Sequence, residues 1–138
     1  MQHDLIRQTS ARPYSRSIKN KKTKGNTIMK KAMLSQPMAG KTNEEIVATR
    51  ERAIATLTAK GYEIINTLFT DEWYGKDAME SRGVVQIPLC FLAKSLENMS
   101  LCHTAYFCKG WENARGCRIE HDAAKAYGLE IIYEEDPV

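Results

Sequence analysis

The stretch "YFCKGWENARGCRIEHDAAKAYGLEII", residues 106–132, decides the fold because it contains a strand, a loop, a helix and the start of another strand. Apolar residues open it, and they return at residues 129–132 after a segment with helical spacing. One side of the predicted helix carries Gly116, Glu120, Ala123, Ala124 and Tyr127. A glutamate on a small and apolar stripe is unusual, so Glu120 is the first candidate for a functional group.

The same alternation extends from residue 30 to the end of the chain. Strands are predicted over residues 30–38, 62–69, 101–110 and 129–135, and helices over residues 41–61, 87–99 and 110–128. Alternating strands and helices imply a single α/β domain with a mostly parallel sheet, right-handed crossovers and helices on both faces, which is a Rossmann-like fold. Residues 70–86 are predicted to form a long polar loop with aromatic residues, a feature that often accompanies function.

The first two helices carry clear local signals. Thr42 or Asn43 can cap the first helix, and Gly61 can end it. The second helix has Pro88 at an early position. The residues predicted to face the core are Ile46, Ala53, Ile54 and Leu57 in the first helix, and Leu89, Leu92, Ala93 and Leu96 in the second.

Charge divides the chain into two regions. Residues 1–31 hold nine Lys or Arg and one acid, so they carry +8, whereas the rest holds eleven Lys or Arg and sixteen acids and carries −5. We interpret residues 1–29 as a disordered basic extension and residues 30–138 as the folded domain. A basic arm that touches nucleic acid is the alternative for the extension, but the acidic domain argues against a nucleic-acid partner.

No apolar run approaches the ~20 residues of a membrane helix, and the first residues lack the apolar core of a secretory signal. We therefore expect a cytoplasmic protein without a membrane partner. The four cysteines form no CxxC pair, which predicts reduced, half-buried thiols and no metal. His103 near Cys102 and Cys108 is the alternative, a metal site. The segment "MAGKT" lacks the first glycine of a phosphate-binding loop, which argues against ATP or GTP hydrolysis.

Ligands of parallel sheets bind beyond the carboxyl ends of the strands. Three predicted segments lie there, residues 35–40, 69–74 and 109–116, and Glu120 follows one turn into the third helix. A carboxylate there can stabilise or bond to an anomeric carbon, and the helix N-terminus is expected to stabilise its ionised form. Arg115 and Arg118 suit an anion, and the nearby aromatic rings suit a nucleobase. The predicted ligand contacts are Ser35, Gln36, Pro37, Met38, Gly40, Asp71, Trp73, Tyr74, Gly110, Trp111, Asn113, Arg115 and Gly116.

From the pattern alone, a solvated or Arg-paired Glu120 and aromatic residues that only pack at the rim remain alternatives. A resemblance adds a more specific hypothesis. The segments "LSQPMAGKTNEEI", "FTDEWY" and "YFCKGWENARGCRIEHDAAKAYGLEII" resemble an uncharacterised bacterial and phage family of the nucleoside 2-deoxyribosyltransferase-like superfamily. The resemblance covers about residues 30–135.

This resemblance implies that Glu120 is the nucleophile at the anomeric carbon of a deoxynucleoside or deoxynucleotide, and that Gly116 is the glycine of the preceding loop. It also implies N-glycosidic cleavage or deoxyribosyl transfer on a small molecule, with no metal or cofactor, in a homo-oligomer. Three positions depart from the enzymes' usual residues: Ala114 for Ser, and His103 and Ser95 for Asp. These departures motivate a second hypothesis, a non-catalytic nucleotide-binding or signal-sequestering protein that a phage could encode. An interaction module with a vestigial site is the third.

Overall fold

The computed structural model describes residues 29–65 and 72–135. The predicted basic extension, apart from Met29, and the candidate residue Asp71 lie outside this part of the chain. The elements in order are β1 (Lys31–Ser35), α3 (Asn43–Ala59), β2 (Glu63–Ile64), η1 (Glu72–Tyr74), α4 (Lys76–Ser81), α5 (Ile87–Met99), β3 (Thr104–Phe107), η2 (Trp111–Asn113), α6 (Arg115–Ala126) and β4 (Glu130–Tyr133).

The four strands form one sheet in the order β2-β1-β3-β4, and every neighbouring pair is parallel. Ser35 pairs with Phe107 and Phe107 pairs with Tyr133, so the carboxyl ends of β1, β3 and β4 meet at one edge. The prediction of an α/β domain with a parallel sheet is confirmed.

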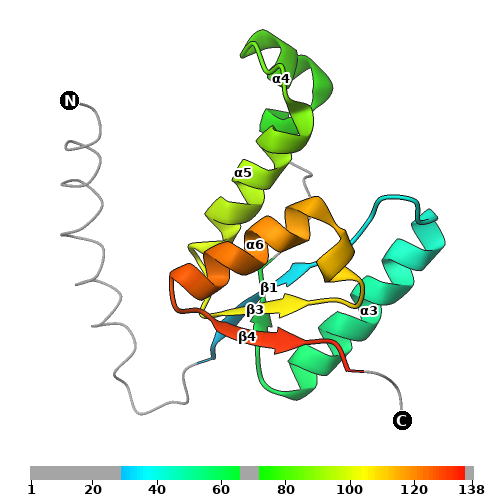
Figure 1. The fold of residues 1–138 in the computed structure, drawn as a ribbon, viewed down its shortest axis with the longest axis vertical. Helices are drawn as coiled ribbons and strands as arrows, with labels where there is room; N and C mark the ends of the chain where they lie inside the picture. Colours follow the sequence, from blue (N-terminus) through cyan, green and yellow to red (C-terminus); the bar gives the residue numbers. More distant parts are fainter. Residues whose placement is uncertain (1–28, 66–71, 136–138) are drawn as a thin grey trace, which may run out of the picture.

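Helices cover both faces of the sheet, as predicted: α3 lies on one side, and α5 and α6 lie on the other (Figure 1). Alternate residues of β1 explain this arrangement, because successive side chains of a strand point to opposite faces. Leu34 packs in the cluster that contains Ala53 and Leu57 of α3. Met33 packs in the cluster that contains Met99 of α5 and Ala124 of α6. The domain therefore has two apolar layers with β1 and β3 between them.

Local signals fix α3 where the sequence places it. The Thr42 hydroxyl accepts the backbone N–H of Glu45, and the Glu45 carboxylate accepts the N–H of Thr42. This reciprocal capping box selects Thr42 over Asn43 as the cap. At the other end, Gly61 has a φ of 89°, a conformation that glycine adopts without a Cβ penalty.

The prediction of a loop over residues 70–86 is wrong for residues 72–81, which contain η1 and α4. Met79 of α4 is only 5% exposed, because this short helix packs its apolar residue inward. The bounds predicted for α5 are correct, but Leu89 is 60% exposed and Ala93 is also exposed. The reason is visible in Figure 1, where the first half of α5 projects from the sheet and carries α4 at its far end.

Three strands, β1, β3 and β4, are shorter than predicted, and residues 66–69 of the second predicted strand lie outside the described residues. β1 stops at Ser35 because its pairing with β3 ends there and Pro37, two residues on, has no N–H to continue a ladder. Tyr127, predicted to face the core, is 85% exposed because α6 ends at Ala126. Among the helices of residues 29–65 and 72–135, none combines the length and apolarity needed to cross a bilayer.

Candidate functional site

A cleft of about 500 Å³ opens at the carboxyl ends of β1 and β3. Its walls are the loop after β1, one face of α5, and the η2–α6 junction. The residues that line it are Gln36, Pro37, Met38, Ala39, Pro88, Phe91, Leu92, Ser95, Asn113, Ala114, Arg115, Gly116, Cys117 and Glu120. Its position is the edge at which parallel sheets bind ligands.

Glu120 lies in the inner part of this cleft and is 7% exposed. The Ser35 hydroxyl, at the end of β1, donates a hydrogen bond of 2.5 Å to its Oε1 atom. The buried face of α6 consists of Cys117, Glu120, His121 and Ala124, so the carboxyl group belongs to the side that faces the sheet. Glu120 is therefore not solvated, and within residues 29–65 and 72–135 no arginine forms an ion pair with it.

Burial raises the pKa of Glu120 above its usual value, while hydrogen bonding by the Ser35 and Ser95 hydroxyls opposes that rise. That the helix N-terminus favours the ionised form of Glu120 stays a prediction, but the pKa of the carboxyl group is raised overall. Glu120 is the sixth residue of α6, beyond the first turn where the helix dipole acts strongly, so loss of water dominates. The site holds a carboxyl group that is easier to protonate than an ordinary glutamate.

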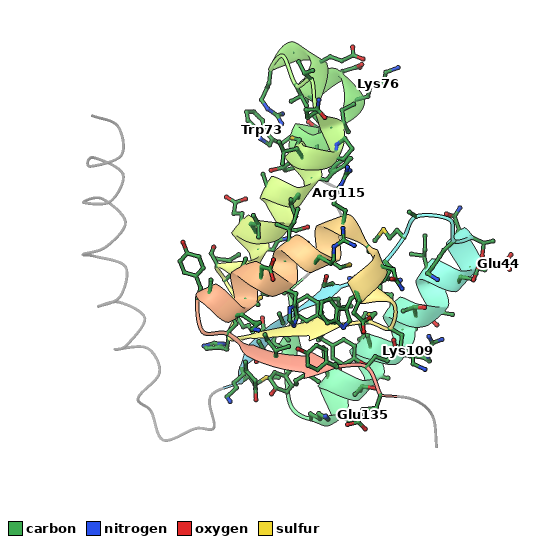
Figure 2. All side chains as sticks on the ribbon, viewed as in Figure 1. Glu44, Trp73, Lys76, Lys109, Arg115 and Glu135 are labelled. Atoms are coloured by element: carbon green, nitrogen blue, oxygen red, sulfur yellow. The ribbon has the colours of Figure 1, made fainter. Side chains whose placement is uncertain are left out.

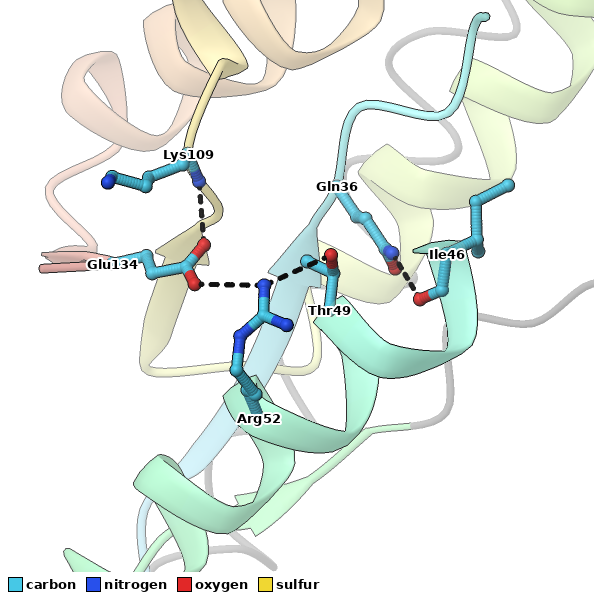
Figure 3. Close-up of polar contacts among 6 residues, drawn as sticks. All are labelled: Gln36, Ile46, Thr49, Arg52, Lys109 and Glu134. Carbon is cyan, nitrogen blue, oxygen red and sulfur yellow. Dashed lines mark hydrogen bonds and ion pairs between the residues drawn. The ribbon is translucent and has the colours of Figure 1, made fainter. Parts of the chain in front are cut away.

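The structure brings half of the predicted ligand contacts to this cleft: Gln36, Pro37, Met38, Asn113, Arg115 and Gly116 line it, and Ser35 contacts Glu120. The loop after β1 is fixed by its own side chain. Gln36 Nε2 donates to the carbonyl oxygen of Ile46 in α3 at 2.6 Å (Figure 3). This wall is therefore tied to the first helix.

The remaining predicted contacts do not line the cleft, and Asp71 lies outside the described residues. Trp73 is 58% exposed, and its ring lies under the Arg82 guanidinium at 3.8 Å. Figure 2 shows Trp73 beside α4 and the first half of α5, which project away from the sheet. Tyr74 contacts the cleft only indirectly, through its ring contact with Phe91 at 6.2 Å between centroids. Gly40 belongs to the turn that precedes α3.

Trp111 lines a second cleft with Tyr133, on the other side of η2. Its ring stacks on His121, with centroids 4.0 Å apart, and His121 Nε2 lies 2.6 Å from the Tyr133 hydroxyl. Gly110 provides the turn before η2 with a φ of 87°. Both residues thus have packing or backbone reasons for their identity.

Glu134 ties the end of β4 to its neighbours beside this second cleft. Its carboxylate accepts the backbone N–H of Lys109 at 2.9 Å and contacts the Arg52 guanidinium at 3.5 Å (Figure 3). The contacts join α3, β4 and the loop after β3, so they fix the edge of the sheet near the sites.

The sequence-based list missed a complete wall of the cleft. Pro88, Phe91, Leu92 and Ser95 of α5 line it. Phe91, Leu92 and Ser95 follow Pro88 by three, four and seven residues, which places all four on one helical face, so the sequence alone could have predicted that they lie together. The predicted core face of this helix, Leu89, Leu92, Ala93 and Leu96, shares only Leu92 with the face that lines the cleft, and Ser95 was considered only as a departure from an Asp.

The opening of α6 contributes groups that suit an anion. Ala114 occupies the N-cap position without a capping side chain, so the first N–H groups of α6 lack that partner. Arg115 is exposed and lies where α6 approaches α5 (Figure 2). Together they provide a cationic rim above the buried carboxyl group.

All four cysteines are free thiols. Cys90 and Cys102 are half-buried, as predicted, whereas Cys108 and Cys117 are buried because they face the apolar layers. Burial raises the pKa of Cys117, which lines the cleft, to about 11, so the residue is a neutral thiol at pH 7. Within residues 29–65 and 72–135, no three His, Cys, Asp or Glu side chains gather as metal ligands would.

A family model described as "Domain of unknown function (DUF4406)" matches residues 29–133, from just before β1 to the end of β4. No curated protein and no solved structure matches the chain.

Proposed function

The chain belongs to the DUF4406 family of domains of unknown function, and from this premise we propose that it binds a deoxynucleoside or deoxynucleotide and cleaves its N-glycosidic bond. Glu120 is the proposed nucleophile. The sugar then passes to another base or to water. The residues and resemblance described above, rather than the family's description, motivate this reaction.

The observation that carries the proposal is the placement of Glu120. A carboxyl group that is 7% exposed lies in the inner part of a cleft at the carboxyl edge of a parallel sheet. Removal from water is costly for a charged group, so such a placement in a stable core is unfavourable without a compensating role. A positive charge that develops on a bound sugar would supply that compensation.

The proposed reaction has two steps. In the first, a Glu120 oxygen bonds to C1′ as the C1′–N bond breaks, and the electron pair of that bond goes to the base, which takes up a proton. In the second, a base nitrogen or water bonds to C1′ and gives up its proton to solvent, while the C1′–O ester bond breaks and its electron pair returns to Glu120 as the carboxylate. No oxidant, reductant or metal is needed for this balance.

The walls of the cleft suit the other parts of such a ligand. Pro37, Met38 and Phe91 offer apolar and aromatic contact for a base. Arg115 and the opening of α6 suit a phosphate group at the rim. A volume of about 500 Å³ falls in the range of small-molecule sites.

A second candidate function is binding of the same ligand without turnover. Glu120 is the one carboxyl group among the described residues that line the cleft. Cleavage needs a proton for the departing base as well as a nucleophile. By the resemblance described above, Ser95 stands at the position where the similar enzymes have an Asp. A binding protein needs no such acid.

Base release distinguishes the two candidates. The protein is incubated with 2′-deoxynucleosides and their 5′-monophosphates, and free base is measured by liquid chromatography. Catalysis predicts release by the wild type and a loss of at least about 10³-fold in Glu120→Gln, as expected for removal of a nucleophile. Glu112→Gln, an exposed glutamate on η2, is the matched control.

Equal release by wild type and Glu120→Gln contradicts the enzyme proposal. Binding measured by calorimetry, with the ligand recovered unchanged, supports sequestration instead. The homo-oligomeric state, the cytoplasmic location and a phage origin stay predictions.

A further inference from the structure

We propose that Ser35 is a positioning residue for Glu120: its hydroxyl holds Oε1, which leaves Oε2 to face the anomeric carbon of the ligand. This inference rests on the proposed function, because it assigns the attacking oxygen of the same carboxyl group. Ser35 itself touches no reacting atom in this account and acts through Glu120.

The identity of Ser35 is unusual for its place. The three residues before it in β1, Ala32, Met33 and Leu34, are buried and apolar, and Ser35 is equally buried at 1% exposure. A hydroxyl group in such a position costs free energy unless it finds a partner. Its partner is the Glu120 carboxyl group, 85 residues later in the chain.

The strand gives this hydroxyl a fixed position. Ser35 pairs with Phe107 of β3, and its carbonyl oxygen accepts the N–H of Cys108 at 2.9 Å. β1 is a central strand of the sheet, and its carboxyl end is held by β3, where Leu34 pairs with Tyr106 and Ser35 pairs with Phe107. A long glutamate side chain from α6 is thereby held by a short side chain from the sheet.

The contact also has a chemical consequence. A hydroxyl donor stabilises a carboxylate, and hydrogen bonding by Ser35 lowers the pKa of Glu120 against the larger effect of burial. When Oε2 bonds to C1′, Oε1 becomes the carbonyl oxygen of the ester and can keep accepting the same hydrogen bond. The contact therefore serves both steps and affects turnover more than ligand binding.

Two neighbours share these hydrogen bonds, and four variants separate the effect of the Ser35 hydroxyl from that of packing. Hydrogen bonding by the Ser35 hydroxyl also lowers the pKa of the Cys117 thiol, and hydrogen bonding by Ser95 of α5 lowers the pKa of Glu120. Ser35→Ala removes the donor, Ser35→Cys keeps a similar size with a weak donor, and Ser35→Thr restores the hydroxyl on a residue that strands favour. Ser100→Ala removes a hydroxyl from the exposed end of α5, outside the cleft lining, and is the matched control.

The test has two readouts. The first is kcat and KM for base release, over a range of pH, with a deoxynucleoside that the wild type cleaves. Ser35→Ala and Ser35→Cys should lower kcat about 10- to 100-fold, the loss expected for one hydrogen bond to a charged group, with little change in KM. The rise of activity with pH should move to higher pH, and Ser35→Thr should recover most of the loss.

The second readout does not depend on turnover. Carboxyl ¹³C signals of the free protein report the titration of Glu120, assigned by its absence in Glu120→Gln. Ser35→Ala should raise the Glu120 midpoint, whereas Ser100→Ala should leave it unchanged. If the wild type releases no base, the proposed function fails, and this titration alone decides the role of Ser35.

Unchanged kcat and an unchanged Glu120 midpoint in a folded Ser35→Ala variant overturn the inference. A Ser35→Thr variant that is as stable as the wild type, yet as impaired as Ser35→Ala in kcat and in the Glu120 midpoint, overturns it as well, because a restored hydroxyl would then have no effect. If Ser35→Ala fails to fold, Ser35→Cys gives the same comparison with a side chain of similar volume.

Discussion

Replacement of Glu120 by glutamine should make the folded domain more stable at pH 8. Burial raises the pKa of this carboxyl group in the folded state above its value in the unfolded chain. Below the unfolded pKa the group is protonated in both states and costs nothing. As pH rises through the folded pKa, the unfolded state loses its proton first, so the stability of the wild type falls.

The size of the effect follows from the burial and contacts of the group. Glu120 is 7% exposed, and the hydroxyls of Ser35 and Ser95 compensate its charge only in part. An incompletely satisfied buried polar group costs about 1–3 kcal/mol. For a domain of roughly 100 residues, this range corresponds to a rise in Tm of about 4–12 °C in Glu120→Gln at pH 8.

Thermal unfolding followed by circular dichroism at pH 4, 6 and 8 measures this gap. The difference in Tm between Glu120→Gln and wild type should be largest at pH 8 and should shrink toward pH 4. Glu112→Gln, which makes the same atomic change on an exposed side chain, should show no gap at any pH. A Glu120→Gln variant no more stable than the wild type at pH 8, or a difference in Tm that does not change with pH, would contradict a raised Glu120 pKa in the folded state.

Three further predictions concern the fold. Leu57→Ala, at a position with 0% exposure, should lower the free energy of unfolding by about 2–5 kcal/mol in urea titrations. A loss below about 0.5 kcal/mol, the least that removing one buried methyl group costs, would contradict the place of Leu57 in the core. Thr42→Ala should cost about 0.5–2 kcal/mol in the same assay, whereas no loss would mean that the capping box is absent. Iodoacetamide at pH 8 should label Cys108 and Cys117 far more slowly in native than in urea-unfolded protein, because burial raises their pKa values to about 12 and 11. Peptide mapping by mass spectrometry measures the two rates, and equal rates in both states would contradict the burial of these thiols.

Much of the fold was predictable because its signals are local or periodic. The capping residues of α3, the alternation of strands and helices, and the helical spacing around Glu120 each depend on neighbours in the chain. The direction in which α5 leaves the sheet depends on distant packing. For that reason Leu89 and Ala93, which fit an apolar stripe, are exposed, and the face with Ser95 lines the cleft.

The candidate site was predictable in position and only partly in composition. The carboxyl ends of parallel strands share one edge of a sheet, so the loops after β1 and β3 were expected to lie together, and Gln36 and Arg115 do line one cleft. The aromatic residues could not be placed in the same way. Trp111 follows β3 directly, yet its ring stacks on His121 in the adjacent cleft, a choice made by side-chain packing in three dimensions.

In the proposed reaction, Glu120 forms a covalent bond with the sugar carbon C1′ of a nucleoside. The most direct test uses 2′-deoxynucleosides with fluorine at C2′, which slows breakdown of a glycosyl ester because the transition state resembles an oxocarbenium ion. Intact-protein mass spectrometry followed by peptide mapping should find the fluorinated sugar on Glu120, with free base released and no adduct on Glu120→Gln. Intact ligand recovered with no adduct, from a wild type that binds it as tightly as Glu120→Gln does, would contradict the account.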